Sequence, residues 1–311
     1  ITSAVTAKYK DADGVLIAAN SAANANTLKW TYFICAVVLV IVSLPMFFYG
    51  FKNTKERYTS DTTPPSLGHN LGLKNDQLLL ILISGILGAA RTVYMYTGSL
   101  YFAKYVLGNE AIYSILTILV VPGGAIATVL IPWFTKHLGK KNTYIYVHVL
   151  GAVVMFAMYF IGRNGGYNNS SNLLWLAIGF VLLGLPQGIN NVITYAMIGD
   201  TVEYLEWKTG ERAEGICFSM QTFINKISMA VGAFIGVMAY GISGISPSDP
   251  YNTVTPEGSE KLWAVLILSG AISMVATIIP MLFYKVTESK QREYVKEIEE
   301  RKAAKAAKTA E

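Results

Sequence analysis

Seven apolar segments, each long enough to cross a bilayer as a helix, dominate this chain of 311 residues. A membrane helix needs about 20 mostly apolar residues, because in lipid the backbone polar groups must bond within the segment. The composition agrees, since 53% of residues are hydrophobic and 14% are charged, against about 25% charged in soluble domains. We therefore predict an all-α, polytopic membrane protein. The expected spans are 29–51, 77–103, 110–134, 143–162, 173–197, 216–243 and 261–285.

The loops between these segments differ in their content of Lys and Arg. The basic ones are the linker 52–76, the loop 135–142 and the tail 287–311. Because basic loops remain on the cytoplasmic side, we expect a cytoplasmic C-terminus and an extracytoplasmic loop at 1–28. The chain begins with Ile1 and shows no signal-peptide pattern. We therefore expect a fragment, cut within a loop, of a multi-pass protein of the cell membrane.

Several classes of protein are disfavoured by the sequence. The net charge of +5 fits loop charges that set topology better than a nucleic-acid-binding surface. Cys35 and Cys217 both lie inside apolar segments, where neither a disulfide framework nor a metal site is expected. The sequence contains no phosphate-binding glycine loop, no metal-spaced His/Cys cluster and no nucleophile placed beside a base. We therefore predict neither an enzyme nor a bound cofactor or metal.

One lysine, Lys226, lies about ten residues inside the sixth apolar segment, roughly 15 Å from its start at 1.5 Å per residue. A charge at that depth costs about 2.5–3.5 kcal/mol on insertion scales, and such groups usually face a partner, a cavity or a substrate. The residues that share its helical face are Gly215, Ser219, Thr222 and Lys226. Gln221 and Asn225 flank that face. The lysine either pairs with a carboxylate to hold helices together or serves substrate binding or ion coupling, and the second interpretation is favoured.

Two other segments carry polar groups at membrane depth. In the fifth segment, Gln187, Asn190 or Asn191, and Thr194 recur on one helical face. That face either bonds neighbouring helices or lines a cavity that binds hydroxyl groups. Near the middle of the second segment lies Arg91, for which pairing with a neighbouring helix or with backbone carbonyls, and a substrate role, both remain open.

A run that begins just before the sixth segment resembles a known family. It reads Asp200-Thr-Val-Glu-Tyr204, Glu206-Trp-Lys-Thr-Gly210, Arg212-x-Glu-Gly215, Ser219-x-Gln-Thr222 and Lys226. In order and in type these residues resemble the loop and eleventh helix of the glycoside–pentoside–hexuronide:cation symporters. That family is the branch of the major facilitator superfamily that includes melibiose permease. The stretch Leu100–Gly108 is similar to the seventh helix of the same family.

The resemblance implies a carrier of twelve helices in two six-helix halves. Residues 29–51 would be the last helix of the N-terminal bundle, and 52–76 the cytoplasmic linker between the bundles. Residues 77–286 would form the C-terminal six-helix bundle, followed by a cytoplasmic tail at 287–311. The first five helices, which in this family hold the acidic cation site, would then be missing. That N-terminal bundle, membrane lipid and a sugar are the expected partners.

The same resemblance implies symport of a glycoside, pentoside or hexuronide with Na⁺ or H⁺ by alternating access. Gln221, Thr222 and Lys226 match the family's sugar-facing positions. The expected substrate-binding set is Lys226, Thr222, Gln221, Asn225, Asn190, Asn191, Gln187 and Arg91.

Some alternatives stay open. The stretch 200–214, with Asp200, Tyr204 and Arg212, is expected to gate or brace the transporter, or is simply a solvated loop. A lipid or drug transporter on the same fold remains an alternative. Its cavity would be wider and more apolar than the one that the polar amides in these segments indicate. A seven-helix receptor or retinal protein also has seven spans, but a retinal lysine belongs in the last span and Lys226 lies in the sixth.

Overall fold

The computed structural model describes residues 21–54, 74–94, 100, 102–107, 110–165, 170–245 and 254–310. The chain divides into two compact units, Ile1–Pro65 and Ser66–Glu311. Five helices in the described residues are long and apolar enough to cross a membrane. The prediction of an all-α, polytopic membrane protein is confirmed.

The first unit contains the helix α2 (Ser21–Asn53). Its central stretch is apolar on every side, and Leu39, Ile41 and Phe47 are each more than half exposed. A helix of this kind needs lipid or other helices around it, because it has no polar face to turn toward water. It contains the expected span 29–51, whereas most of the expected linker, 55–73, lies outside the described residues.

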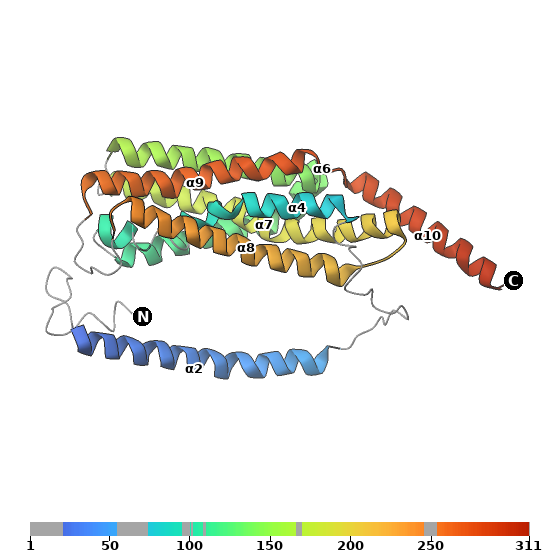
Figure 1. Cartoon of the computed structure of the whole chain (residues 1–311), viewed down its shortest axis with the longest axis horizontal. Coiled ribbons are helices and arrows are strands. Elements are labelled where there is room, and N and C mark those ends of the chain that lie inside the picture. Colours follow the sequence, from blue (N-terminus) through green and yellow to red (C-terminus); the bar gives the residue numbers. More distant parts are fainter. Residues whose placement is uncertain are drawn as a thin grey trace. The chain divides into compact units, whose positions relative to one another are not determined.

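The second unit is a bundle of helices with one more helix at its C-terminal end (Figure 1). Its elements are α4 (Asp76–Leu87), the 3₁₀ turn η3 (Ala89–Thr92), the π-helical turn η5 (Phe102–Val106), α6 (Glu110–Gly165), α7 (Ser170–Thr209), α8 (Glu214–Ile242), α9 (Pro256–Leu282) and α10 (Glu288–Ala310). In Figure 1, α10 extends from the end of the bundle at which α9 finishes. Local sequence sets where α9 begins. The Thr255 side chain accepts a hydrogen bond from the Gly258 N–H, and Pro256 occupies the first turn.

The 56-residue helix α6 consists of two helices joined at Gly139. Gly139 has φ 77° and ψ 160°, a backbone conformation that glycine adopts because it has no Cβ. Leu116 and Met155, which come from different halves of α6, pack in the same hydrophobic cluster. The two halves therefore run antiparallel, and they correspond to the expected spans 110–134 and 143–162.

The expected span 77–103 is interrupted, which corrects the prediction of one continuous helix. α4 ends at Leu87, Gly88 leads into η3, and η5 closes the segment. Side chains bond the carbonyls freed at this break. Ser273 Oγ of α9 donates to the carbonyl O of Leu87 at 2.6 Å, and Arg91 Nη1 donates to the carbonyl O of Gly88 at 3.0 Å. Broken helices are tolerated in membranes where neighbours satisfy the backbone in this way.

Glycines let α7 pack closely against the first half of α6. A Cβ added at Gly123 would lie 1.9 Å from the carbonyl O of Val181, and one added at Gly184 would lie 2.2 Å from the carbonyl O of Val120. Both obstacles are backbone atoms, which cannot rotate away as a side chain could. Small residues are the usual means of close helix approach in membranes.

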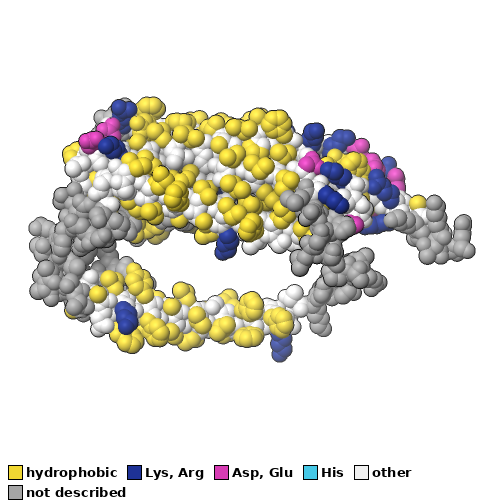
Figure 2. Space-filling model, in the orientation of Figure 1, with side chains coloured by type: hydrophobic (Ala, Val, Ile, Leu, Met, Phe, Trp, Pro, Cys, Tyr) yellow, Lys and Arg dark blue, Asp and Glu magenta, His cyan; other side chains and the backbone are white. Residues whose placement is uncertain are grey.

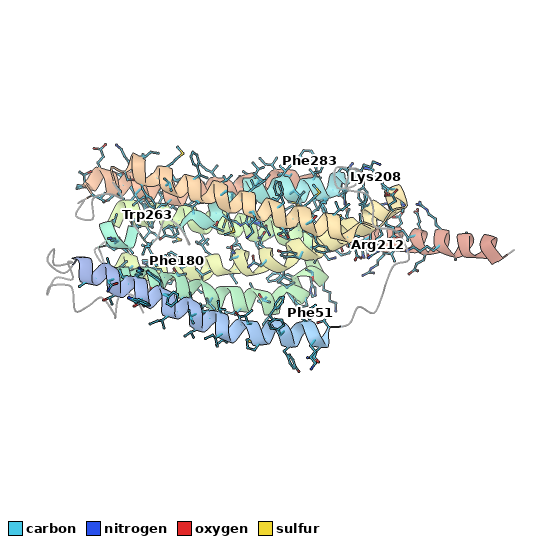
Figure 3. All side chains as sticks on the ribbon, turned by 60° about the horizontal axis from the view of Figure 1, so that its bottom comes forward. Phe51, Phe180, Lys208, Arg212, Trp263 and Phe283 are labelled. Atoms are coloured by element: carbon cyan, nitrogen blue, oxygen red, sulfur yellow. The ribbon has the colours of Figure 1, made fainter. Side chains whose placement is uncertain are left out.

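Charged side chains gather at the ends of the bundle, whereas its flank in Figure 2 is mostly hydrophobic. Lys208 and Arg212 lie at the end from which α10 extends, hereafter the charged end, and Trp263 lies toward the opposite end (Figure 3). Trp263 is fully buried, and its Nε1 donates to the carbonyl O of Tyr159 at 3.1 Å. The bundle thus has an apolar flank suited to lipid and charged residues at both of its ends.

Candidate functional site

The expected substrate residues of α8 include a stripe that points away from the packed bundle. The exposed residues of this stripe are Gly215, Ser219, Thr222 and Lys226. At its edge, Asn225 is half-buried and Gln221 is 5% exposed. Lys226 forms no ion pair with any acidic residue that the structure describes. Its charge is therefore available to a partner or a substrate outside the described part of the chain.

A second stripe lies on α7. Gln187 is half-buried, and Asn191 and Tyr195 are exposed, so residues four apart share one outward face. Asn190 is 8% exposed, and its Oδ1 accepts a hydrogen bond from the hydroxyl of Thr194 at 3.3 Å. Of the two asparagines left open by the sequence, Asn191 thus faces outward and Asn190 faces the packed interior.

Hydrogen bonds connect the two stripes. Gln221 Nε2 donates to Asn225 Oδ1 at 3.0 Å, and Asn225 Nδ2 donates to the hydroxyl of Tyr195 at 3.4 Å. The buried Oε1 of Gln221 has no hydrogen-bond partner among the described residues. The structure therefore unites polar groups of α7 and α8 into one polar face, defined by Gln187, Asn191, Tyr195, Gln221, Thr222, Asn225 and Lys226.

Arg91 lies apart from this polar face. Its guanidinium lies close enough to Tyr144 and His148 of α6 to interact with them electrostatically. A Cβ added at Gly88 would lie 2.0 Å from Arg91 Nη1 and 3.2 Å from Thr277 Oγ1, so the guanidinium lies beside α9. Its buried Nε has no hydrogen-bond partner within the described ranges. The structure thus places Arg91 in the bundle interior, and its role in substrate binding stays a prediction.

Next to Arg91 is a buried cluster of hydroxyl groups. Ser84 Oγ lies 2.9 Å from the hydroxyl of Tyr144 and 2.8 Å from Thr277 Oγ1. His148 is fully buried, and its Nδ1 lies 2.8 Å from the carbonyl O of Tyr144. That nitrogen carries the proton, because a carbonyl oxygen can only accept. These bonds join α4, α6 and α9 at the depth of the helix break.

At the charged end, Asp200 is bonded across two helices. Lys140 Nζ donates to both carboxylate oxygens of Asp200, at 2.6 and 2.7 Å, and Asp200 is only 7% exposed. The backbone N–H of Lys140 also donates to Glu288 Oε1 at 2.5 Å. Because Lys140 follows Gly139 directly, the reversal within α6 is tied to both α7 and the start of α10.

Tyr204 and Lys208 of α7 both bond Asp76 at the start of α4. The Tyr204 hydroxyl donates to Asp76 Oδ1 at 2.9 Å, and Lys208 Nζ donates to the same oxygen at 2.5 Å. Burial acts to raise the pKa of Asp76, but hydrogen bonds from Lys208, Gln77 and Tyr204 outweigh it and hold that pKa at about 2. The carboxylate therefore stays ionised at any physiological pH.

Arg212 is bonded to carboxylates on either side of it. Its Nη1 donates to Glu206 Oε2 at 2.9 Å, and it also pairs with Glu214. Burial acts to lower the pKa of Arg212, but the hydrogen bonds and charges of these two carboxylates raise it. Glu206 is 6% exposed and receives a second cation, since Lys302 Nζ of α10 lies 2.7 Å from its Oε1. A role of this stretch as a gate stays a prediction.

The helix α10 packs on the end of α7 through aromatic rings and hydrogen bonds. The rings of Trp207 and Tyr294 have centroids 4.6 Å apart. Trp207 Nε1 donates to Glu297 Oε2 at 2.7 Å, and Arg301 Nη1 donates to the carbonyl O of Trp207 at 2.7 Å. The tail, expected as a separate segment at 287–311, is thus attached to the bundle through contacts that reach as far as Lys302.

Comparison with known proteins identifies the family. The family described as "MFS/sugar transport protein" matches residues 12–288. The chain belongs to this family. Within it, the chain is 27% identical over 274 residues to "Glucuronide carrier protein homolog" of Escherichia coli strain K12, an alignment that covers 87% of this chain and 58% of that protein.

Two further relatives are similar to this chain at the same level. One is the "Putative sulfoquinovose importer" of the same Escherichia coli strain, 29% identical over 261 residues, which are 81% of this chain and 53% of that protein. The other is the "Isoprimeverose transporter" of Lactiplantibacillus pentosus, 26% identical over 262 residues, which are 82% of this chain and 52% of that protein. The chain spans about half the length of these relatives. The resemblance to sugar symporters is confirmed, and the family is one of transport proteins rather than enzymes.

Sequence patterns did not reveal several residues that the structure brings into the site. Tyr195 follows Asn191 by four residues, so its place on the polar face could have been found from helical periodicity. The partners Lys140 of Asp200 and Lys302 of Glu206 come from distant segments, and no local pattern indicates them.

Neutralising Glu206 should loosen the attachment of α10 to α7. Glu206→Gln removes the charge shared by Arg212 and Lys302, so trypsin should release the tail several times faster than in the wild type. Glu299→Gln, at an exposed carboxylate of α10 itself, is the matched control and should leave the rate unchanged. Equal rates for wild type and Glu206→Gln would show that the shared carboxylate does not hold α10.

Proposed function

We propose that the complete protein is a secondary active transporter that moves a glycoside, pentoside or hexuronide together with Na⁺ or H⁺ by alternating access. The observation that carries this proposal is the polar face of α7 and α8, on a bundle that belongs to a family of sugar transport proteins. Amides, a hydroxyl and an ammonium group at membrane depth suit a ligand that is a ring of hydroxyl groups.

The position of Lys226 supports coupling between sugar and cation. It lies twelve residues after Glu214, where α8 begins, or about 18 Å along the helix at 1.5 Å per residue. A lysine at that depth requires an anionic partner, and the described chain supplies none. Carboxylates of an N-terminal bundle would fill this role and would also bind the coupling cation. Binding of the cation and binding of the sugar would then both depend on the same pairing of Lys226 with these carboxylates. That pairing would lie at the interface about which the two bundles rock.

The charged end belongs to this proposal as the cytoplasmic side. The basic loops and tail favour a cytoplasmic C-terminus in the cell membrane. There the bonded residues Asp200, Tyr204 and Arg212 would brace or gate the mouth of the transport path. Asp200 bonds α6, Tyr204 bonds α4, and Arg212 bonds Glu206, the carboxylate that also pairs with Lys302 of α10. These bonds support a part in holding that end of the bundle.

The names of the relatives bear on the substrate class. They include carriers named for an anionic sugar, such as glucuronide or sulfoquinovose, and for a neutral one, isoprimeverose. All of these are sugars, so a sugar is favoured over a lipid or a drug. The exposed amides of the polar face point the same way, because a cavity for a lipid or drug would be more apolar.

Counterflow tests the proposal without any assumption about the coupling cation. Vesicles containing the complete protein are loaded with unlabelled melibiose, a methyl β-xyloside or a glucuronide, and entry of the labelled sugar is followed. Transient uptake of one of the three is the expected result, and it names the class. Failure of all three, in a protein that inserts correctly, would favour the lipid or drug transporter.

A further inference from the structure

Tyr195 is an aromatic residue on the outward face of α7. It is 46% exposed, and it follows Gln187 and Asn191 at intervals of four residues, which puts the three on one side of the helix. A face that carries two amides is poorly suited to hydrocarbon, because polar side chains turn toward a cavity or a partner in membranes. The ring of Tyr195 therefore borders a polar space.

Hydrogen bonds orient this ring from the packed side of the bundle. Asn225 Nδ2 donates to the Tyr195 hydroxyl at 3.4 Å, and Asn225 Oδ1 accepts from Gln221 Nε2 at 3.0 Å. Gln221 is 5% exposed, so the chain of bonds starts in the interior and ends at an exposed phenol. Because Asn225 directly precedes Lys226, the ring lies at the same depth as that lysine.

A sugar presents two kinds of surface to a protein. Its hydroxyl edge needs donors and acceptors, which Thr222, Lys226 and Asn191 provide on this polar face. Its C–H face needs a flat apolar surface, which an aromatic ring offers at little cost in conformational entropy. Tyr195 combines that surface with a polar tip already bonded to Asn225.

We propose that Tyr195 is the platform on which the sugar ring stacks, with Asn225 as its positioning residue. The inference deepens the proposed function and rests on it, since the occupant is taken to be a sugar. It assigns the apolar contact of the site to Tyr195 of α7, and the polar contacts to Asn191 of α7 and to Thr222 and Lys226 of α8.

The test compares three variants of the complete protein in counterflow with whichever of melibiose, methyl β-xyloside or glucuronide the wild type carries. Tyr195→Ala removes the ring and should raise KM roughly tenfold, the equivalent of about 1.4 kcal/mol. Tyr195→Phe keeps the ring and should change KM far less. Tyr146→Ala is the matched control, because Tyr146 is 57% exposed on α6 beside the exposed Val149 and Val153, and it should leave KM unchanged.

Protection from a thiol reagent gives a readout that does not depend on transport. In a cysteine-free background, the transported sugar should slow maleimide labelling of Tyr195→Cys and leave labelling of Tyr146→Cys unchanged. Absence of protection, or an unaltered KM in Tyr195→Ala, would overturn the platform role while leaving the transporter intact. An effect of Tyr195→Phe as large as that of Tyr195→Ala would also overturn it, because the hydroxyl and not the ring would then matter. If the wild type carries none of the three sugars, it is the proposed function that fails.

Discussion

Replacement of Lys226 by alanine should abolish sugar accumulation by the complete protein while leaving its insertion into the membrane intact. The lysine is exposed in the middle of α8 and has no acidic partner among the described residues. Removing one member of a charge pair at low dielectric costs about 3–5 kcal/mol, and each 1.4 kcal/mol is tenfold. We therefore expect accumulation of about 1% of the wild-type level or less, measured with labelled sugar in vesicles that contain equal amounts of protein.

A second lysine provides the control for this prediction. Lys261 lies near the start of α9, where its Nζ is 2.7 Å from Glu257 Oε1 and its side chain is half exposed. An exposed pair four residues apart on a helix contributes only about 0.3–0.5 kcal/mol. Lys261→Ala should therefore transport normally. Wild-type accumulation by Lys226→Ala would remove the lysine from the proposed mechanism.

The largest expected effect on stability is at Gly184. An added Cβ there would lie 2.2 Å from the carbonyl O of Val120 and 2.8 Å from the backbone N of Gly124. Neither atom can move without separating α7 from the first half of α6. Gly184→Ala should lower the free energy of unfolding by about 1–3 kcal/mol or more, as overpacking does elsewhere. The melting temperature of the purified protein in detergent measures this effect.

Another glycine of α7 is the matched control. A Cβ added at Gly199 would have no neighbouring atom within 4 Å. Gly199→Ala should leave the melting temperature unchanged or raise it slightly, because alanine in a helix is favoured over glycine by about 0.5–1 kcal/mol. If Gly184→Ala melted like Gly199→Ala, the close packing of α6 against α7 would be refuted.

Apolar runs predict most of these helices well. In lipid the backbone polar groups must bond within the segment, so an apolar run of sufficient length forms a helix. Such runs could not predict the break after Leu87, because the residues of this expected span up to Leu87 are mostly apolar and show no proline. The carbonyl of Leu87 at this break is bonded by Ser273, a residue of α9 far along the chain, and no local pattern indicates that partner. Similarly, the predicted loop 135–142 contains a reversal at Gly139 alone, with helix on both sides.

For the polar face, too, the sequence predicts the spacing of residues along one helix but not the side that the helix turns toward its neighbours. Periodicity correctly groups Ser219, Thr222 and Lys226 on one exposed stripe. It could not choose between Asn190 and Asn191, since adjacent residues on a helix differ by only part of a turn. The choice depends on which side α7 turns toward its neighbours, and this is a property of the packed bundle.

Gradient-driven accumulation is the measurement that tests the central claim most directly. Vesicles that contain the complete protein are given an inward gradient of Na⁺ or of H⁺, and the internal concentration of the sugar identified by counterflow is followed. The account predicts accumulation above the external concentration under one of the two gradients, and its collapse when an ionophore dissipates that gradient. Equilibration of the sugar without accumulation under either gradient would contradict cation-coupled symport.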